Sequence, residues 1–405
     1  MATVRPIRET IPLHEARALV LNAARPIERV ERIPIADAHG RVIAAAPVST
    51  VDVPPFDRAA MDGYAVIAED TFGASANDPR VLRSIEAVFT GEIARQRVTR
   101  GTCIQIATGA PLPEGADAVV MVEETEKRGD DEIRILTPVY PRQHVGRRGA
   151  DITAGQTLLS MGDVLTPSRV GALAAVGLTG IDVFAQPRVA IMSTGDEIVE
   201  PGQPLAPGQL YDINRFTLSS IVAAHGGVPV VYPAVGDDLP ALNRAVAAAE
   251  DDDIVVFSGG SSVGEHDLVI DVIGGLGDVI FHGIAVKPGK PTTFGRIGRR
   301  PVFGMPGYPT SCLSNGYMLL VPLLRRIARL PDYQPHTVQL PLSRRVVSTT
   351  GRHQFYTVRI QDGAAVPAFK ASGDITSMAH ADGYIEIPAQ TDIVEAGEPV
   401  IVKLF

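Results

Sequence analysis

The feature that most constrains the fold is an alternation of apolar strands and helices between residues 187 and 330. Strands are expected at 189–192, 228–235 and 253–258, and helices at 214–224, 239–250 and 311–330, the last bent at Pro322. Parallel strands need crossover helices between them, and this β-α-β-α order supplies them. It therefore predicts a doubly wound parallel α/β sheet.

Strand signals dominate the chain on both sides of this unit. An amphipathic helix at 13–23 stops at Pro26, and short alternating apolar runs fill 53–141. Residues 142–184 are mixed, with a helix that begins after the hydroxyl cap Thr166 and stops at Gly177. Residues 331–405 return to strands. The predicted fold class is a multidomain α/β plus β protein.

Composition narrows the class of protein. With 405 residues, 45% of them hydrophobic and 20% charged, the chain is globular and long enough for several domains. The sequence contains no apolar run of ~18–20 residues for a membrane span and no secretory apolar segment near its start. Cys103 and Cys312 are too few for a disulfide framework or a four-thiolate zinc site. We expect a reduced, cytoplasmic protein.

The charge balance argues against a nucleic-acid binder, because the net charge is −9. Only five of the 37 basic residues are lysines, yet Lys287 and Lys290 lie three positions apart, in the segment KPGKP. A chain that avoids lysine but places two together is using compact ammonium charges there, unless the placement is chance.

Ligands of parallel sheets bind at the carboxyl ends of the strands. That rule selects four loops, at 193–197, 236–238, 258–267 and 304–311, with the lysine pair between the last two. Each loop also has a purely structural interpretation: Asp237 and Asp238 can cap a helix, and Gly259 and Gly260 can form a tight turn. Their convergence on one predicted edge favours a binding site.

The residue types at this edge suit a polyanion. Glycine lets backbone N–H groups approach oxygen atoms, and an ammonium ~4 Å from an anionic oxygen contributes roughly 4 kcal/mol at an effective dielectric of 20. The carboxylates Glu197, Asp237 and Asp267 would repel phosphate unless a cation such as Mg²⁺ lies between them. The sequence therefore indicates metal-assisted chemistry on a phosphorylated ligand.

Two common catalytic motifs fit poorly. Residues 260–264 match G-x-S-x-G, but Glu265 and Asp267 place negative charge beside the oxyanion position, and no HGGG-type segment is present. Gly289-Lys290 lacks the Ser or Thr of a P-loop, and Ile284 stands where its first glycine belongs.

Five motifs, in order along the chain, resemble those of the molybdopterin molybdenumtransferases, the MoeA and gephyrin E-domain family. They are FDRAAMDGYA at 56–65, TGAPLPEGAD at 108–117, STGDE at 193–197, SGGSSVGEHD at 258–267 and KPGKP at 287–291. The resemblance runs from about residue 50 to residue 320 and fits the chain's length.

The resemblance implies four domains and a dimer. A discontinuous mixed α/β domain comprises 1–52 and 142–184, and a mostly-β domain is inserted at 53–141. The molybdopterin-binding α/β domain spans 185–330, and a small β barrel spans 331–405. Family members are homodimers with a composite active site between the α/β domain of one subunit and the β domain of the other, and the adenylyltransferase is a further partner suggested by the resemblance.

The implied reaction takes adenylylated molybdopterin and molybdate to the molybdenum cofactor and AMP, with Mg²⁺. The implied catalytic residues are Asp62, Thr108, Glu197, Asp237, Asp267, Lys287 and Lys290, of which Glu197, Asp237 and Asp267 hold the metal. The implied substrate- and oxyanion-binding residues are Ser258, Gly259, Gly260, Ser262, Pro306, Pro309, Ser311, Arg352 and Ser372. Neither nucleic acid nor a membrane is an expected partner.

Two positions depart from the family pattern: Tyr308 replaces a usual asparagine and Asp382 replaces another. Because Tyr308 lies in the loop expected to form the oxyanion site, the sequence leaves open whether the protein prefers molybdate or tungstate. The alternative functions are tungstate insertion by the same chemistry, adenylylation of molybdopterin, and a non-enzymatic gephyrin-like scaffold. The adenylyltransferase resembles only 185–330, and a scaffold would not need the full set of acidic residues and lysines.

Overall fold

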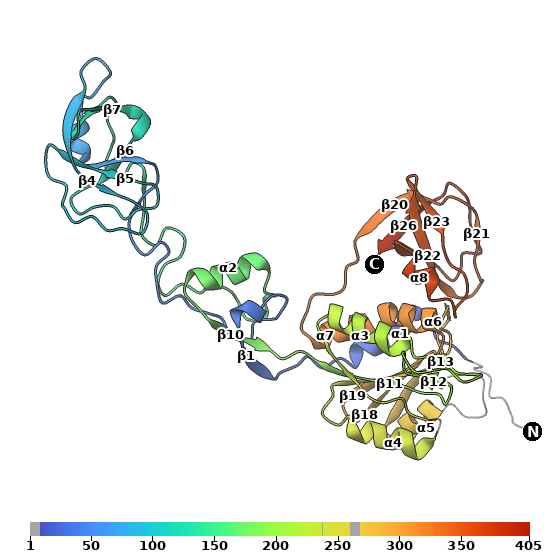
Figure 1. The fold of residues 1–405 in the computed structure, drawn as a ribbon. Helices are drawn as coiled ribbons and strands as arrows, with labels where there is room; N and C mark the ends of the chain where they lie inside the picture. The colour runs from blue at the N-terminus through green and yellow to red at the C-terminus, as the bar shows by residue number, and fades with distance from the viewer. Residues whose placement is uncertain (1–8, 237, 260–267) are drawn as a thin grey trace, which may run out of the picture. The chain divides into compact units, whose positions relative to one another are not determined.

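A computed structural model describes residues 9–236, 238–259 and 268–405, which form two compact units (Figure 1). The main unit comprises Met1–Glu31, Gly40–Val42 and Val183–Phe405, and the inserted unit comprises Arg32–His39 and Ile43–Asp182. Among the described residues, no helix is long and apolar enough to cross a membrane. The finer division into four domains stays a prediction.

The main unit is built on a six-stranded sheet. In spatial order its strands are β14 (Val228–Val231), β11 (Arg188–Ser193), β15 (Ile254–Ser258), β19 (Arg300–Met305), β18 (Thr293–Ile297) and β16 (Asp278–His282). The first four are parallel, as predicted, but β18 runs antiparallel to both of its neighbours, β19 and β16. Only Gly298 and Arg299 join β18 to β19, and such a short connection can make only a hairpin. The sheet is therefore mixed.

Helices cover both faces of this sheet. Val189 and Ile191 pack in one core cluster with α1 (Leu13–Asn22), α3 (Asn214–Ala224) and α7 (Val321–Ile327). The alternate residues Ala190 and Met192 pack in another cluster with α4 (Leu239–Ala248) and α5 (Leu268–Leu276). This period of two puts an apolar side chain on each face and explains why β11 reads as one continuous apolar run.

Two predicted elements differ in extent. The strand expected at 228–235 ends at Val231, just before Pro233, which has no N–H to donate. The single bent helix expected at 311–330 is three pieces: α6 (Pro309–Asn315), a π-helical turn, η4 (Gly316–Leu320), and α7. Pro322 sits in the first turn of α7, where the wider π turn precedes it. The irregularity therefore precedes the proline.

The C-terminal β strands form a closed ring. The path runs through β22 (His353–Gln361), β24 (Gly383–Ile387), β26 (Pro399–Leu404) and β20 (Thr337–Pro341), and β23 (Ala364–Pro367) pairs with β22. A bridge between Leu342 and Ala365 completes the circuit. A further strand, β17 (Val286–Lys287), pairs in parallel with β22. The lysine segment is thus joined to the C-terminal strands through backbone hydrogen bonds.

The inserted unit carries a second six-stranded sheet, in agreement with the predicted mostly-β segment. Its strands, in spatial order, are β6 (Ala118–Met121), β3 (Gly63–Val66), β5 (Thr102–Ile106), β4 (Arg80–Val88), β8 (Glu132–Ile135) and β7 (Thr125–Arg128). The predicted helix is α2 (Pro167–Ala175), where the Thr166 side chain accepts the Arg169 N–H at 3.4 Å. Gly177, at φ 78°, follows the helix end.

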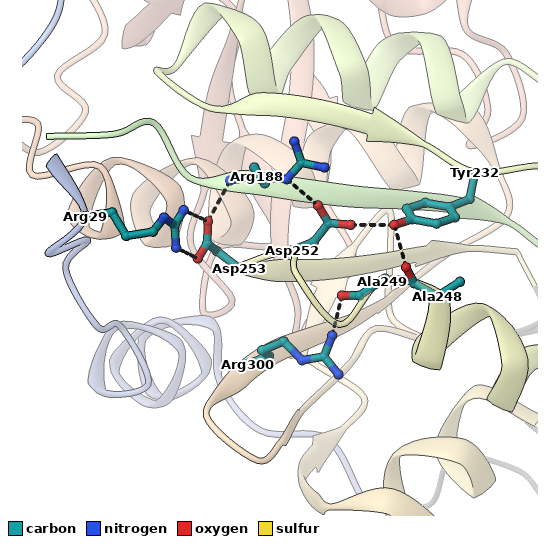
Figure 2. Close-up of polar contacts among 8 residues, drawn as sticks. All are labelled: Arg29, Arg188, Tyr232, Ala248, Ala249, Asp252, Asp253 and Arg300. Atoms are coloured by element: carbon teal, nitrogen blue, oxygen red, sulfur yellow. Dashed lines mark hydrogen bonds and ion pairs between the residues drawn. The ribbon is translucent and has the colours of Figure 1, made fainter. Parts of the chain in front are cut away.

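A polar cluster anchors the amino ends of the central strands (Figure 2). Arg29 donates to both carboxylate oxygens of Asp253 at 2.8 Å, and the backbone N–H of Arg188 donates to the same carboxylate. Buried Asp252 accepts from the Arg188 guanidinium at 3.0 Å and from the Tyr232 hydroxyl at 2.7 Å. Burial and the Asp252 bond raise the pKa of Tyr232 to about 12. The acidic turn between α4 and β15 is therefore structural.

Two titratable groups, the partly buried Glu386 and the buried His225, have strongly lowered pKa values. Glu386 contacts Lys403 at 2.9 Å, His353 at 3.2 Å and Arg17 at 3.5 Å. Burial opposes its ionisation, but the hydrogen bonds from His353 and Lys403 and the charge of Arg17 prevail and lower its pKa to about 2. His225 packs edge-on against Tyr333, and burial, aided by Arg325, lowers its pKa to about 4.

We predict that acid destabilises the main unit in two steps. Between about pH 6.5 and 4, unfolding frees His225 to take up a proton, so falling pH removes stability on the order of 2 kcal/mol. Below about pH 4.5, unfolding likewise lets Glu386 bind a proton, and stability falls further. His225→Phe keeps the aromatic packing and should make the first step smaller, measured as the melting temperature at pH 7 and pH 5, with the remainder owed to His282, whose pKa burial also lowers. An equal loss in both proteins would contradict the assignment.

Candidate active site

A cleft of about 1120 Å³ opens at the carboxyl ends of β11, β15 and β19 in the main unit. Its walls come from segments far apart in the sequence: 193–198, 205–214, 258–259, 286–291, 306–311, 352 and 369–373. The edge rule, by which ligands bind at the carboxyl ends of parallel strands, selected three of these segments from the sequence. We call this hollow the main cleft.

The lysines of the chain concentrate on the main cleft, together with one arginine. Lys287, Lys290, Lys370 and Arg352 all line it, so three of the five lysines meet there. Lys370 therefore joins, in space, the two lysines that lie together in the sequence. Lys370 was missed, because it lies 80 residues from Lys290 in a β segment. Lysine scarcity was the one signal that could have pointed to it.

Buried polar side chains fix the backbone of the lysine segment, residues 287–291. Asn315, fully buried in α6, donates from Nδ2 to the Gly289 carbonyl at 2.8 Å and to Thr292 Oγ1 at 2.5 Å. Thr292 Oγ1 donates in turn to the Gly289 carbonyl at 2.9 Å. Gly289 has φ 101°, and a Cβ there would lie 2.3 Å from Asn315 Nδ2. Glycine is therefore required between the two lysines.

The end of β15 forms a narrow backbone turn at the cleft. Ser258 is buried beside Ser193, and Gly259 has φ 109°, with a notional Cβ 2.2 Å from the Thr194 carbonyl oxygen. Thr194 and Asn214 are wall residues of the cleft, and their atoms Oγ1 and Oδ1 are buried and lack a hydrogen-bond partner among the described residues. Unsatisfied buried polar atoms are costly, so the cleft wall carries hydrogen-bonding capacity that no described residue uses.

The first turn of α6 is tied to the C-terminal β segment. The Thr310 N–H donates to the Ser372 carbonyl at 3.1 Å, and Thr310 Oγ1 to the Asp374 carbonyl at 3.1 Å. Tyr308, 66% exposed, lies over Gly373, where a Cβ would be 3.6 Å from the ring. The predicted residues Pro306, Pro309, Ser311 and Ser372 all line the cleft here. Tyr308 adds an aromatic ring that an asparagine would not supply.

The structure describes only some of the acidic residues predicted for the site. Glu197 lines the cleft, as does Asp212, whose carboxylate accepts the Arg215 N–H at 3.1 Å at the start of α3. Asp237, Gly260, Ser262 and Asp267, all predicted site residues, lie outside the described residues. Within the described part of the chain, no group of three His, Cys, Asp or Glu side chains is placed to hold a metal ion.

The two upstream motifs meet in the inserted unit. The N–H and hydroxyl of Thr108 both donate to Asp62 Oδ1, at 2.7 and 3.0 Å. These bonds, the backbone one first, lower the pKa of the exposed Asp62 carboxyl. Gly63 lies against Val120, where a Cβ would be 1.8 Å from the carbonyl oxygen. Two motifs 46 residues apart thus meet at one carboxylate, Asp62, which accepts hydrogen bonds from Thr108.

Family comparisons cover almost the whole chain. The MoeA N-terminal region (domain I and II) matches residues 11–177, a probable molybdopterin binding domain matches 190–326, and the MoeA C-terminal region (domain IV) matches 339–405. The chain belongs to the MoeA family. The predicted resemblance is confirmed, and the three matches follow the order that it implied.

Curated relatives and a solved structure agree with this membership. The chain is 36% identical over 391 residues to molybdopterin molybdenumtransferase 2 of Mycobacterium tuberculosis, covering 94% of this chain and 95% of that protein. It is 31% identical to the Haemophilus influenzae molybdopterin molybdenumtransferase, with 98% of each covered. A crystal structure of the molybdopterin biosynthesis MoeA protein from Pyrococcus horikoshii has TM-score 0.83 and 42% identity, covering 98% of this chain and 99% of that one.

We predict that Gly289→Ala is far more damaging than a matched glycine substitution. Gly298, in the β18–β19 turn, also has positive φ, but a Cβ there meets nothing within 4 Å. Gly298→Ala should therefore cost only about 1 kcal/mol of backbone strain. Gly289→Ala must also displace Asn315 and should cost roughly 3 kcal/mol. Urea unfolding of both variants measures the difference, and equal losses would show that Asn315 yields freely.

Proposed function

We propose that this MoeA-family protein is a molybdopterin molybdenumtransferase, which inserts molybdate into adenylylated molybdopterin and releases AMP. The observation that carries the proposal is the convergence of Lys287, Lys290, Lys370 and Arg352 on one cleft of a chain with net charge −9. The curated names of its relatives supply the reaction class. Matches to the N-terminal and C-terminal MoeA regions favour this activity over a lone adenylyltransferase.

In this proposal the basic residues bind the two anionic groups of the reaction. Lys287 and Lys290 hold the incoming oxyanion, with Ser311 at the wall of the cleft. Arg352 and Lys370 attract the phosphoanhydride, and the turn at Ser258 and Gly259 lets its oxygens approach the backbone. A rigid arrangement of positive charge lowers the barrier because it already suits the charge that develops on the departing phosphate.

Mg²⁺ is part of the proposal, with Glu197, Asp237 and Asp267 as the residues that would hold it. Mg²⁺ often binds through one or two carboxylates plus substrate phosphates and retains several waters. A cleft with Glu197 at its wall fits that mode, because the phosphates of the substrate would complete the set. When bound, the ion would supply charge neutralisation at the phosphoanhydride.

We predict that Lys287→Ala and Lys290→Ala each reduce oxyanion-dependent AMP release at least ~tenfold, because each removes a charge that faces the reacting anions. The assay incubates the protein with adenylylated molybdopterin, Mg²⁺ and either molybdate or tungstate, and quantifies AMP. Lys127→Ala is the control, since this exposed lysine lies in β7 of the inserted unit. Wild-type rates in both cleft variants would remove the lysines from the site. Comparing the two oxyanions tests the tungstate alternative.

We further propose that the active form is a homodimer in which Asp62 and Thr108 of one subunit complete the cleft of the other. The support is chemical: the Asp62–Thr108 turn is exposed and ionised, and the neighbouring apolar side chains Met61 and Val122 are 44% and 45% exposed. Exposed apolar groups around a polar centre favour burial against another surface.

Mixing Asp62→Ala chains with Lys290→Ala chains tests this arrangement. We predict recovery of about a quarter of the wild-type activity, because half of the random dimers would be hybrids and each hybrid has one intact cleft. Activity is measured after subunit exchange at equal concentrations, with each variant alone as the baseline. A wild-type protein that is active as a monomer, by ultracentrifugation at the assay concentration, would exclude the composite site.

A further inference from the structure

Lys287 is tied to the C-terminal β segment by its side chain as well as by its backbone. Its strand, β17, pairs with β22, where Val286 opposes His353 and Lys287 opposes Gln354. Beyond this pairing, the Lys287 ammonium donates a hydrogen bond to Thr349 Oγ1 at 2.7 Å. Thr349 precedes β22 and is not a wall of the main cleft, whereas Lys287 is.

The segment that carries Thr349 is itself well braced. The Arg352 N–H donates to the Thr349 carbonyl at 3.3 Å, and the Gly351 N–H donates to the Ala389 carbonyl at 2.9 Å. The Thr350 hydroxyl bonds Asp392 Oδ1 at 2.6 Å. The hydroxyl of Thr349 therefore offers the ammonium a fixed acceptor, and the same short turn presents Arg352 to the cleft.

We infer that Thr349 is a positioning residue that acts through Lys287. A lysine side chain has four rotatable bonds and loses up to about 2 kcal/mol of conformational entropy when it is ordered. One charge-assisted bond to a braced hydroxyl restricts the ammonium to the rim of the cleft before any anion arrives. The C-terminal β segment thereby sets the position of a charge carried by the lysine segment, which connects β16 and β18 of the α/β sheet. The role of Lys287 in binding the oxyanion rests on the proposed function.

A purely structural role for Thr349 makes a different prediction, and the neighbouring threonine provides the control. Thr349→Val keeps the shape of the side chain and removes the acceptor, whereas Thr349→Ser retains a hydroxyl. Thr350→Val removes a hydroxyl from the same turn, but one that bonds Asp392 rather than Lys287. If the hydroxyls only brace the turn, the two valine variants should behave alike.

The decisive measurement is a double-mutant cycle on oxyanion-dependent AMP release. We expect Thr349→Val to raise the KM for molybdate about five- to tenfold with little change in kcat, and Thr349→Ser to restore most of the loss. In a Lys287→Ala background, Thr349→Val should have no further effect, because the group it positions is gone. Thr350→Val should stay within about twofold of wild type. Additive losses in the cycle, or equal effects of the two valine substitutions, would overturn the inference.

A second readout does not depend on the reaction. Trace acetylation followed by peptide mass spectrometry gives the relative reactivity of all five lysines, with exposed Lys127 as the internal reference. Release of Lys287 in Thr349→Val should raise its labelling at least about twofold relative to Lys127, with Lys290 and Lys370 unchanged. Unchanged labelling of Lys287 would overturn the inference. If the wild-type protein releases no AMP but the labelling of Lys287 still rises in Thr349→Val, the proposed function alone is refuted.

Discussion

The geometry of the main cleft depends on the parallel pairing of β17 with β22. This short pairing joins the lysine segment, which connects β16 and β18 of the α/β sheet, to the C-terminal strands. Asn315 fixes Gly289 from the helical side, and Thr349 holds the Lys287 ammonium from the strand side. Two flexible cations are thereby restricted by three independent contacts, only one of which involves their own side chains. The charge of the cleft is a product of the tertiary fold.

A local excess of positive charge in an acidic chain has a physical consequence for binding. The net charge of −9 repels polyanions at long range, but beyond about 10 Å that repulsion is screened at physiological salt. Inside the cleft, the effective dielectric is lower and the basic residues act at close range. An anion therefore gains most of its attraction only after it enters. Such a site selects ligands by fit more than by electrostatic capture from solution.

Much of this was predictable, because periodicity reports burial. The helix at 214–224 matches α3 residue for residue, and the apolar run at 254–257 is the buried centre of β15. The edge rule then brought Ser193, Ser258 and Ser311 to one cleft without any knowledge of their contacts. Connection length was the missed signal at 298–299, since a two-residue link excludes a parallel crossover. The sequence analysis was therefore weakest at the ends of elements and in the direction of the strand β18.

Other site features could not be predicted, because they arise from distant pairings. Lys370, Asn315 and Thr349 carry no motif, and each is significant only through what it touches: the cleft, the Gly289 carbonyl and the Lys287 ammonium. Nothing in the local sequence of Asn315 distinguishes it from a buried helical asparagine. Such residues become visible only when segments 26 or 62 positions apart are placed together.

The π-helical turn Gly316–Leu320 gives the chain an unusual tolerance of length at this point. A π turn is an α-helix with one residue to spare, so deleting a residue there would restore a regular helix at little local cost. In a regular helix each residue advances the side chains by about 100°, but the wider turn already absorbs the extra residue, and α7 is anchored in the core by Leu323 and Leu324. The shorter helix would therefore keep its anchor and leave Asn315 facing Gly289. Homologues that are one residue shorter here would be expected to hold their lysine segments by the same contact.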